Sequence, residues 1–161
     1  MRTREEAWAA LDDGFKELMD CLGQLTEDEL TSAPVAGIWT VKDVINHVWS
    51  WLDEALHTAK SWQEDRPWQK GIVYDDAWNE EQVVDRAVLP LLTVVDGVTS
   101  AHRRLMHLLD ATDDDDLAQV SVAPWGEEMP LVDFFYGMAD HYTEHVRDLK
   151  AYQGRCLEGC P

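Results

Sequence analysis

Four long segments of the sequence carry apolar side chains at intervals of three or four residues, and this spacing restricts the chain to amphipathic helices. The repeat gathers the apolar side chains on one side of each helix, and that side must be buried against other helices. The segments run over residues 3–23, 41–64, 90–110 and 130–153. Since no stretch reads convincingly as a strand, we expect an all-α four-helix bundle.

Capping signals predict where the first two helices begin. Thr3 with Glu6, and Thr40 with Asp43, have the spacing of a capping box. In that motif the threonine side chain and the acid three residues later each accept a hydrogen bond from the other's backbone N–H. Both pairs stand directly before an apolar series, as a helix start requires.

The connections between the helices carry turn residues and aromatic side chains. Residues 65–78 read as a loop that carries Trp68, Tyr74 and Trp78, and such aromatic side chains often line the mouth of a pocket. Asn79 can cap a short extra helix over residues 80–88, before the third long helix. The acidic run 112–116 is typical of a solvated turn or a single helical turn. Calcium binding is the weaker alternative, because the run lacks the glycine and the distal glutamate of a calcium loop.

Length and cysteine content favour one cytoplasmic domain. A chain of 161 residues suffices for one core but not two, so we expect a single domain over 1–161 with a frayed tail over 153–161. Cys21, Cys156 and Cys160 form no disulfide framework, and reduced thiols are expected, with a metal site or disulfide between the last two as the weaker alternative. The N-terminal residues are too acidic for a secretory signal, and no segment approaches the ~20 apolar residues of a membrane helix.

The charge of the chain is strongly negative. Its 32 acidic and 13 basic side chains give a net charge of −19. Such a field repels phosphate backbones and anionic lipid, so we expect neither a nucleic-acid nor a membrane partner. Solubility alone accounts for most of the acidity, which by itself identifies no ligand.

Three histidines are candidates for a metal site. His141 and His145 are one helical turn apart, so their rings project from the same face about 6 Å apart and can share an ion. A pair hydrogen-bonded at a helix surface is the plainer alternative. Both lie on the apolar side of their segment, however, and His47 lies on the inner edge of residues 41–64. A shared divalent ion would satisfy one nitrogen of each ring and leave positions open, as in catalytic zinc sites.

Other polar residues near these histidines have two interpretations each. Glu144 could act as a general base, although a solvated helix face is the more common role. Asp43 could orient the His47 ring, but its capping role already explains it. His102 could face the same pocket as a fourth ligand or a substrate contact, and a hydrogen-bonded core histidine is the other interpretation.

Eight tryptophans are many for a chain of this length. Trp8 and Trp51 lie on apolar stripes and read as core residues, and Trp51 is also a pocket candidate. Trp39 and Trp125 fall near helix ends or loops, where they could wall a cavity. The predicted substrate pocket therefore comprises Trp39, Trp51, His102 and Trp125.

Four segments of the sequence carry a family resemblance. GIWTVKDVINHVWSW in the second helix, followed much later by HYTEHV in the last, resembles the DinB/YfiT-like superfamily. AWNEEQVVDR and TSAHRRLMHLLD are similar to the ClbS/DfsB branch of that superfamily. The resemblance covers nearly the whole chain, and the order and spacing of the phrases are more specific than any one of them.

The resemblance implies a four-helix bundle, often a homodimer, that holds a zinc or nickel ion on three histidines, here His47, His141 and His145. Relatives include transferases and isomerases that use bacillithiol, mycothiol or glutathione. The ClbS/DfsB branch includes self-protection against a genotoxin by opening its reactive ring, and its members need not use the three histidines.

Together these features predict an enzyme that uses a divalent metal to activate water or a low-molecular-weight thiol against a small electrophile, in detoxification or self-resistance. The alternative is a stress-induced or binding protein, in which the ion orders the bundle and the pocket holds a small molecule without turnover.

Overall fold

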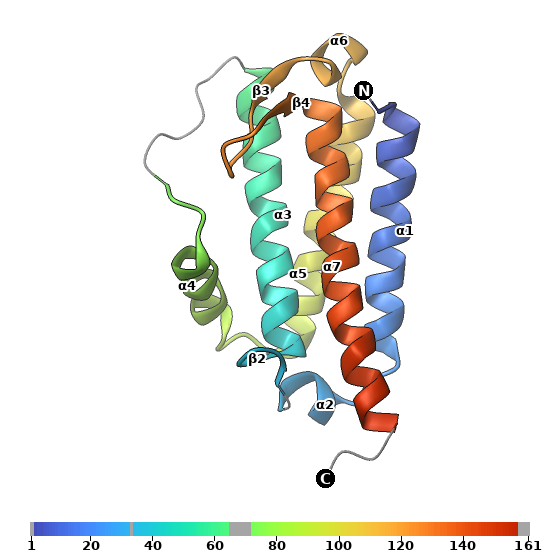
Figure 1. The fold of residues 1–161 in the computed structure, drawn as a ribbon, viewed down its shortest axis with the longest axis vertical. Coiled ribbons are helices and arrows are strands. Elements are labelled where there is room, and N and C mark those ends of the chain that lie inside the picture. The colour runs from blue at the N-terminus through green and yellow to red at the C-terminus, as the bar shows by residue number, and fades with distance from the viewer. Residues whose placement is uncertain (1, 33, 65–71, 158–161) are drawn as a thin grey trace.

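Four long helices form the body of the protein in a computed structural model that describes residues 2–32, 34–64 and 72–157, without the side chains of 155–157. They stand side by side in Figure 1. Their bounds are α1 (Arg4–Gly23), α3 (Val41–Gln63), α5 (Leu91–Ala111) and α7 (Leu131–Leu157). The most extensive pairs are α1 with α7 and α3 with α5. The all-α four-helix bundle predicted from the apolar spacing is confirmed.

Short elements close the two ends of the bundle. One end carries α2 (Glu27–Thr31) and the antiparallel hairpin of β1 (Pro34–Ala36) with β2 (Trp39–Thr40). The other end carries α6 (Asp114–Leu117) and the antiparallel hairpin of β3 (Val120–Val122) with β4 (Glu128–Pro130), as Figure 1 shows. The expectation of no strand is therefore wrong at these hairpins, because strands of two or three residues leave no alternating pattern to detect.

The helix starts follow the capping boxes. The side chain of Thr3 accepts a hydrogen bond from the N–H of Glu6, and that of Thr40 accepts one from the N–H of Asp43. In return, each acid accepts a hydrogen bond from the backbone N–H of its threonine. The extra helix is confirmed as α4 (Asp76–Arg86), beside α3 in Figure 1. It begins earlier than predicted, because the side chain of Asp75 caps it by accepting from the Trp78 N–H. Asn79, the predicted cap, lies inside this helix.

The core runs along the whole length of the four long helices. Trp8, expected there, is 38% exposed, whereas Trp62 is only 2% exposed and packs on Phe134 at 5.3 Å between ring centroids. The assignment of Trp8 to the core is thus wrong, since it stands at the edge of its apolar stripe. The largest fully buried side chains are Trp62, Tyr142, Phe134, Phe135, Leu11, Leu18, Ile45, Leu52, Leu105, Leu109, Leu131 and Leu149.

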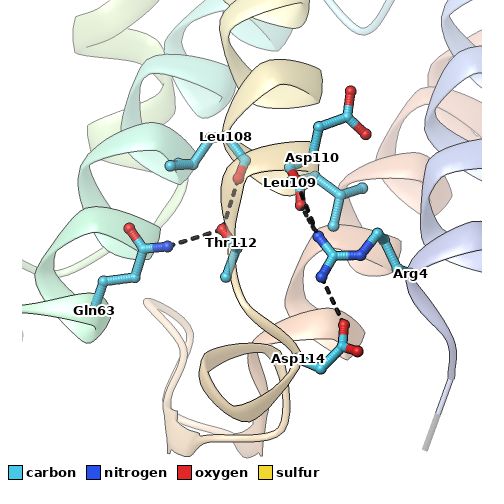
Figure 2. Close-up of polar contacts among 7 residues, drawn as sticks. All are labelled: Arg4, Gln63, Leu108, Leu109, Asp110, Thr112 and Asp114. Carbon is cyan, nitrogen blue, oxygen red and sulfur yellow. Dashed lines mark hydrogen bonds and ion pairs between the residues drawn. The ribbon is translucent and has the colours of Figure 1, made fainter.

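Polar side chains tie three helices together at the end that carries α6 (Figure 2). The Arg4 guanidinium donates to the carbonyl of Leu109 at 2.6 Å and to the Asp114 carboxylate at 2.6 Å. The Thr112 hydroxyl donates to the Leu108 carbonyl at 2.6 Å and accepts from the Gln63 amide at 2.8 Å. The C-terminal carbonyls of α5, which lack partners within the helix, are thereby satisfied from α1 and from Thr112 itself.

Several remaining sequence predictions concern the connections and the tail. The acidic run ends in one helical turn, α6, as one of the two alternatives stated. The backbone is helical to Leu157, so fraying from residue 153 is wrong up to that point. Trp68, Cys160 and the Cys156 side chain lie outside the described residues, and Cys21 is a buried free thiol. No helix in the described part of the chain is long and apolar enough to span a membrane.

Candidate metal centre

Helices α3 and α7 bring His47, His141 and His145, hereafter the triad, to one point. The Nε2 atom of His141 lies 3.1 Å from Nε2 of His47 and 2.9 Å from Nε2 of His145. One ring nitrogen of each residue lies within 4.8 Å of the other two. The spacing of one helical turn accounts for the pair on α7, and the packing of α3 against α7 adds His47.

The triad is held in its neutral form. Burial, with a smaller contribution from the neighbouring His145, lowers the pKa of His47 to about 3. Burial likewise lowers the pKa of His141 well below its usual value, with smaller contributions from the other two rings. For His145, burial lowers the pKa while nearby Asp148 opposes the shift. Neutral imidazoles keep a lone pair free, which is the form that binds a metal ion.

Protons alone cannot satisfy the contacts within the triad. A neutral imidazole has one N–H and one lone pair, so His141 Nε2 has either one hydrogen or one lone pair for two neighbouring nitrogens. In addition, the Nδ1 atoms of His47 and His145 are buried and have no hydrogen-bond partner among the described residues. The nearest acid to His145 Nδ1 is Asp148, whose carboxylate is 3.7 Å away and therefore beyond hydrogen-bond distance.

A divalent ion fits this donor set. If the three Nε2 lone pairs faced one ion, the conflict at His141 would disappear and each Nδ1 would carry the hydrogen. Two nitrogens bound at 2.0–2.1 Å to tetrahedral zinc lie roughly 3.3 Å apart, a few tenths of an ångström more than the two separations from His141 Nε2. Imidazole donors suit zinc and nickel alike, so these residues could hold either ion.

A cavity of about 390 Å³ opens beside the triad. Its apolar walls include Trp51, Trp125 and Met138, and its polar side chains include Asn79 and Glu144. A small organic molecule could therefore lie against aromatic rings with one end at the histidines. The lining residues are His47, Trp51, Asn79, Trp125, Gly137, Met138, His141 and Glu144.

Three of the four predicted pocket residues lie at or beside this cavity. Trp51 lines it, 6.1 Å from His141 between ring centroids, and donates from Nε1 to the Asn79 amide oxygen at 3.0 Å. Trp125, 42% exposed, lines it from the turn between β3 and β4. Trp39 flanks His47 at 5.1 Å between centroids and donates to Glu80 at 3.0 Å.

His102, the fourth predicted pocket residue, lies elsewhere. Its ring stacks on Phe15 with 3.9 Å between centroids, and its Nδ1 is 3.0 Å from the Tyr142 hydroxyl. It lines a separate cavity with Trp8 and Asp12. The placement of His102 in the triad's pocket is thus wrong, and the alternative of a hydrogen-bonded core histidine describes it. Its apolar stripe does contact the core, but on the α1 side of the bundle.

Two carboxylates named from the sequence have different surroundings. Glu144 is exposed and lines the triad's cavity, so its side chain can reach both solvent and a bound molecule. Asp43 accepts hydrogen bonds from both the backbone N–H and the hydroxyl of Thr40, at 2.9 Å and 2.7 Å. That geometry is the capping role, as the sequence analysis favoured for this residue.

Two aromatic residues named from the sequence as candidates for a pocket mouth lie beside the site. Tyr74 and Trp78 form an aromatic cluster with Trp51, at centroid distances of 5.5 Å and 5.1 Å, and so back one wall of the cavity. The roles of Asn79 and Asp148 were not identified from the sequence: Asn79 accepts from the Trp51 indole, and the Asp148 carboxylate lies 3.7 Å from His145 Nδ1. The spacing of three between His145 and Asp148 could have indicated their proximity, whereas nothing local indicates Asn79.

The sequence profile of the DinB superfamily matches residues 10–149, which is most of the chain. The chain belongs to the DinB superfamily. A search of curated proteins finds no match.

Solved structures similar to this DinB superfamily chain share its fold at low sequence identity. The mycothiol-dependent maleylpyruvate isomerase has a TM-score of 0.80 at 14% identity, and the match covers 92% of this chain and 61% of that enzyme. Hence the chain spans about three fifths of that enzyme's length. YfiT from Bacillus subtilis, described as a probable metal-dependent hydrolase with a four-helix bundle topology, has a TM-score of 0.71 at 21% identity, covering 94% of this chain and 87% of YfiT.

A third structure corrects one prediction. The colibactin self-resistance protein ClbS, in complex with a dsDNA, has a TM-score of 0.78 at 15% identity, covering 93% of this chain and 94% of ClbS. The prediction that excluded a nucleic-acid partner on the basis of net charge is therefore wrong for this fold. Net charge averages over the whole surface, whereas a phosphate backbone contacts only one face of a protein.

Proposed function

We propose that this chain is a metal-dependent enzyme in which the triad holds a divalent transition ion, zinc or nickel. The reaction we propose is attack of water or a low-molecular-weight thiol on a small electrophile. The observation that carries the proposal is the convergence of three neutral imidazoles, that of His47 buried and the other two half-buried, at the edge of a cavity that His47 and His141 line. Three protein ligands leave room for further ligands at the ion, as in catalytic rather than structural zinc sites.

Glu144 is the residue we assign to proton transfer. A bound divalent ion supplies Lewis acidity, which makes a water or thiol acidic enough to ionise near neutral pH. The Glu144 carboxylate lines the same cavity as His47 and His141, and we propose that it accepts the proton. Because Glu144 is also exposed to solvent, it can release that proton to water between turnovers.

The walls of the cavity suit an electrophile with a flat or apolar part. Trp51 and Trp125 present ring surfaces 6.4 Å apart between centroids, and Met138 adds a flexible apolar contact. The Trp125 ring lies over Gly137, where a Cβ would make only an ordinary van der Waals contact with it at 3.9 Å. Asn79 keeps the Trp51 indole in place by accepting its N–H.

The setting of the reaction is proposed from the family. One similar structure is mycothiol-dependent and another is a self-resistance protein, which is why thiols and reactive small rings belong in the assay. The homodimer that the family resemblance implies and the cytoplasmic location stay predictions. Sedimentation equilibrium of the purified protein would test the first of them.

The experiment compares metal-loaded wild type, Glu144→Gln and Asp140→Asn. Epoxides, cyclopropanes and maleyl compounds are assayed with and without several thiols. We expect wild type to accelerate at least one pair, and Glu144→Gln to lower that rate by about 100-fold with unchanged metal content. Asp140 is an exposed acid one turn earlier on α7 and serves as the control, with an unchanged rate expected.

His47→Ala should lose both the ion and the activity. If wild type matches the uncatalysed rate for every pair, yet retains a small molecule in its cavity, the chain is a binding protein instead.

A further inference from the structure

The basic side chains of this acidic protein are unevenly distributed. A groove of about 390 Å³ lies between α3 and α5 and is lined by three of the 13 basic residues of the chain, Lys60, Arg103 and Arg104. The imidazole of His107 and the hydroxyl of Ser100 line it too. Leu56 and Leu108 complete the lining, so none of the lining residues carries a negative charge.

This basic groove is separate from the triad. The two cavities share no lining residue. Leu56 follows His47 by nine residues on α3, which rotates it by roughly 180° around the helix axis. The groove therefore lies on the opposite side of α3, and a ligand there would not meet the metal ligands.

One carboxylate, that of Asp53, forms an ion pair with an arginine of the basic groove but does not neutralise the charge of the groove. Asp53 lies 3.6 Å from Arg104 and 3.5 Å from Arg86, so its single charge is divided between two guanidinium groups. On the other side, Arg103 and His107 also line a neighbouring cavity that includes Asp12 and Asp110. These acids belong to the neighbouring cavity, whereas Arg103 on α5 and Lys60 on α3 line the groove from different helices.

We infer that the basic groove between α3 and α5 binds a phosphate group. A phosphate offers several oxygens and up to two negative charges, which match an arginine, a lysine and a hydroxyl that approach from two helices. A carboxylate has fewer oxygens and one charge, so it would use fewer of these donors. Because the donors are exposed, each contact is weak, and binding depends on engaging several of them at once.

A small phosphate compound and the backbone of a nucleic acid present the same group. The test therefore uses two probes, inorganic pyrophosphate and a short labelled duplex DNA, with full-length, metal-free protein. Pyrophosphate binding is followed by shifts of backbone amide resonances in NMR spectra, and DNA binding by fluorescence anisotropy. Competition between the probes shows whether they occupy one site.

Matched variants locate the site. Lys60→Gln/Arg103→Gln removes two charges from the basic groove, and Arg147→Gln/Lys150→Gln removes two exposed charges from α7. We expect pyrophosphate to shift the resonances of residues 56–60 and 100–108 in wild type. The groove variant should bind it about tenfold more weakly, and the α7 variant should bind like wild type.

Each outcome decides the inference. Pyrophosphate binding in the groove without DNA binding identifies a small phosphate compound, and mutually competing binding of both identifies a nucleic-acid backbone. The inference is overturned if neither probe binds wild type, if the two double variants weaken binding equally, or if the shifts cluster around the triad.

Discussion

Two sets of histidines, His102 alone and the triad, lie on different sides of α7. They differ in what their ring nitrogens contact. His102 packs on Phe15, and its Nδ1 contacts the Tyr142 hydroxyl at 3.0 Å. In the triad, three Nε2 atoms crowd together, and two Nδ1 atoms have no hydrogen-bond partner in the part of the chain that the structure describes. Burial lowers the pKa in both groups. A lowered pKa therefore does not separate a metal ligand from a core histidine, whereas unsatisfied nitrogens do.

The largest expected effect is the loss of metal binding in His141→Ala. His141 lies between the other two rings, so its removal should weaken zinc affinity by at least about a thousandfold. A competition titration against a chelating dye at neutral pH measures this. His102→Ala is the matched control and should keep the wild-type affinity. Wild-type protein that stays metal-free with added zinc and nickel would contradict the distinction between the two groups.

The free energy of unfolding should respond in the reverse order, with a larger loss in His102→Ala than in His141→Ala. His102→Ala leaves a cavity beside Phe15 and a buried Tyr142 hydroxyl without its partner, so we expect the free energy of unfolding to fall by about 3 kcal/mol. His141→Ala in metal-free protein should cost about 1 kcal/mol or less, because it relieves the crowding of nitrogens and opens onto a cavity. Urea unfolding of the metal-free proteins measures both values, and a larger loss for His141→Ala would refute this ordering.

Acid should destabilise the metal-free protein through both groups. Histidine in the unfolded chain titrates near ~6.5, and burial lowers the pKa of folded His102 to about 4. The unfolded state thus binds more protons below that unfolded value, and the stabilisation present above it is lost as the pH falls. In His102→Leu the loss of unfolding free energy between about pH 7 and pH 5 should shrink by about 2 kcal/mol.

Urea unfolding at the two pH values measures this change. A wild-type pH dependence in His102→Leu would show that His102 is not neutral in the fold.

The smallest predicted effect concerns a positioning residue. Asp148 lies 3.7 Å from His145 Nδ1, and a carboxylate there favours the tautomer whose Nε2 lone pair faces the other rings. Asp148→Asn should therefore weaken zinc affinity about tenfold. Asp140→Asn removes an exposed acid from the same helix and should not change the affinity. Equal affinities in the two variants would assign Asp148 to the solvated surface.

Features that depend on a few neighbouring residues were predictable from the sequence. The capping boxes at Thr3 and Thr40 fix the starts of α1 and α3, because each box is complete within four residues. The spacing of His141 and His145 places both rings on one face of a helix whatever that helix packs against. The long apolar repeats specify four helices for the same reason.

Features that depend on how the helices pack were not predictable. The stripe of α5 shows that His102 is buried, but the rotation of α5 in the bundle decides whether the ring faces the triad or Phe15. Asn79 looked like a helix cap, and only the approach of α4 to α3 reveals its bond to Trp51. Whether a residue at the edge of an apolar stripe is buried or exposed also depends on the packing, as the exposed Trp8 shows.

The pairing of α1 with α7 has a consequence for how the protein is made. During synthesis α1 emerges from the ribosome long before α7, its main packing partner, so most of its apolar face stays uncovered until α7 arrives. Two of the three triad imidazoles are on α7, so the nascent chain presents no complete triad until then. The metal loading that we propose would therefore follow completion of the bundle, and the ion would bind the finished protein rather than its growing precursors.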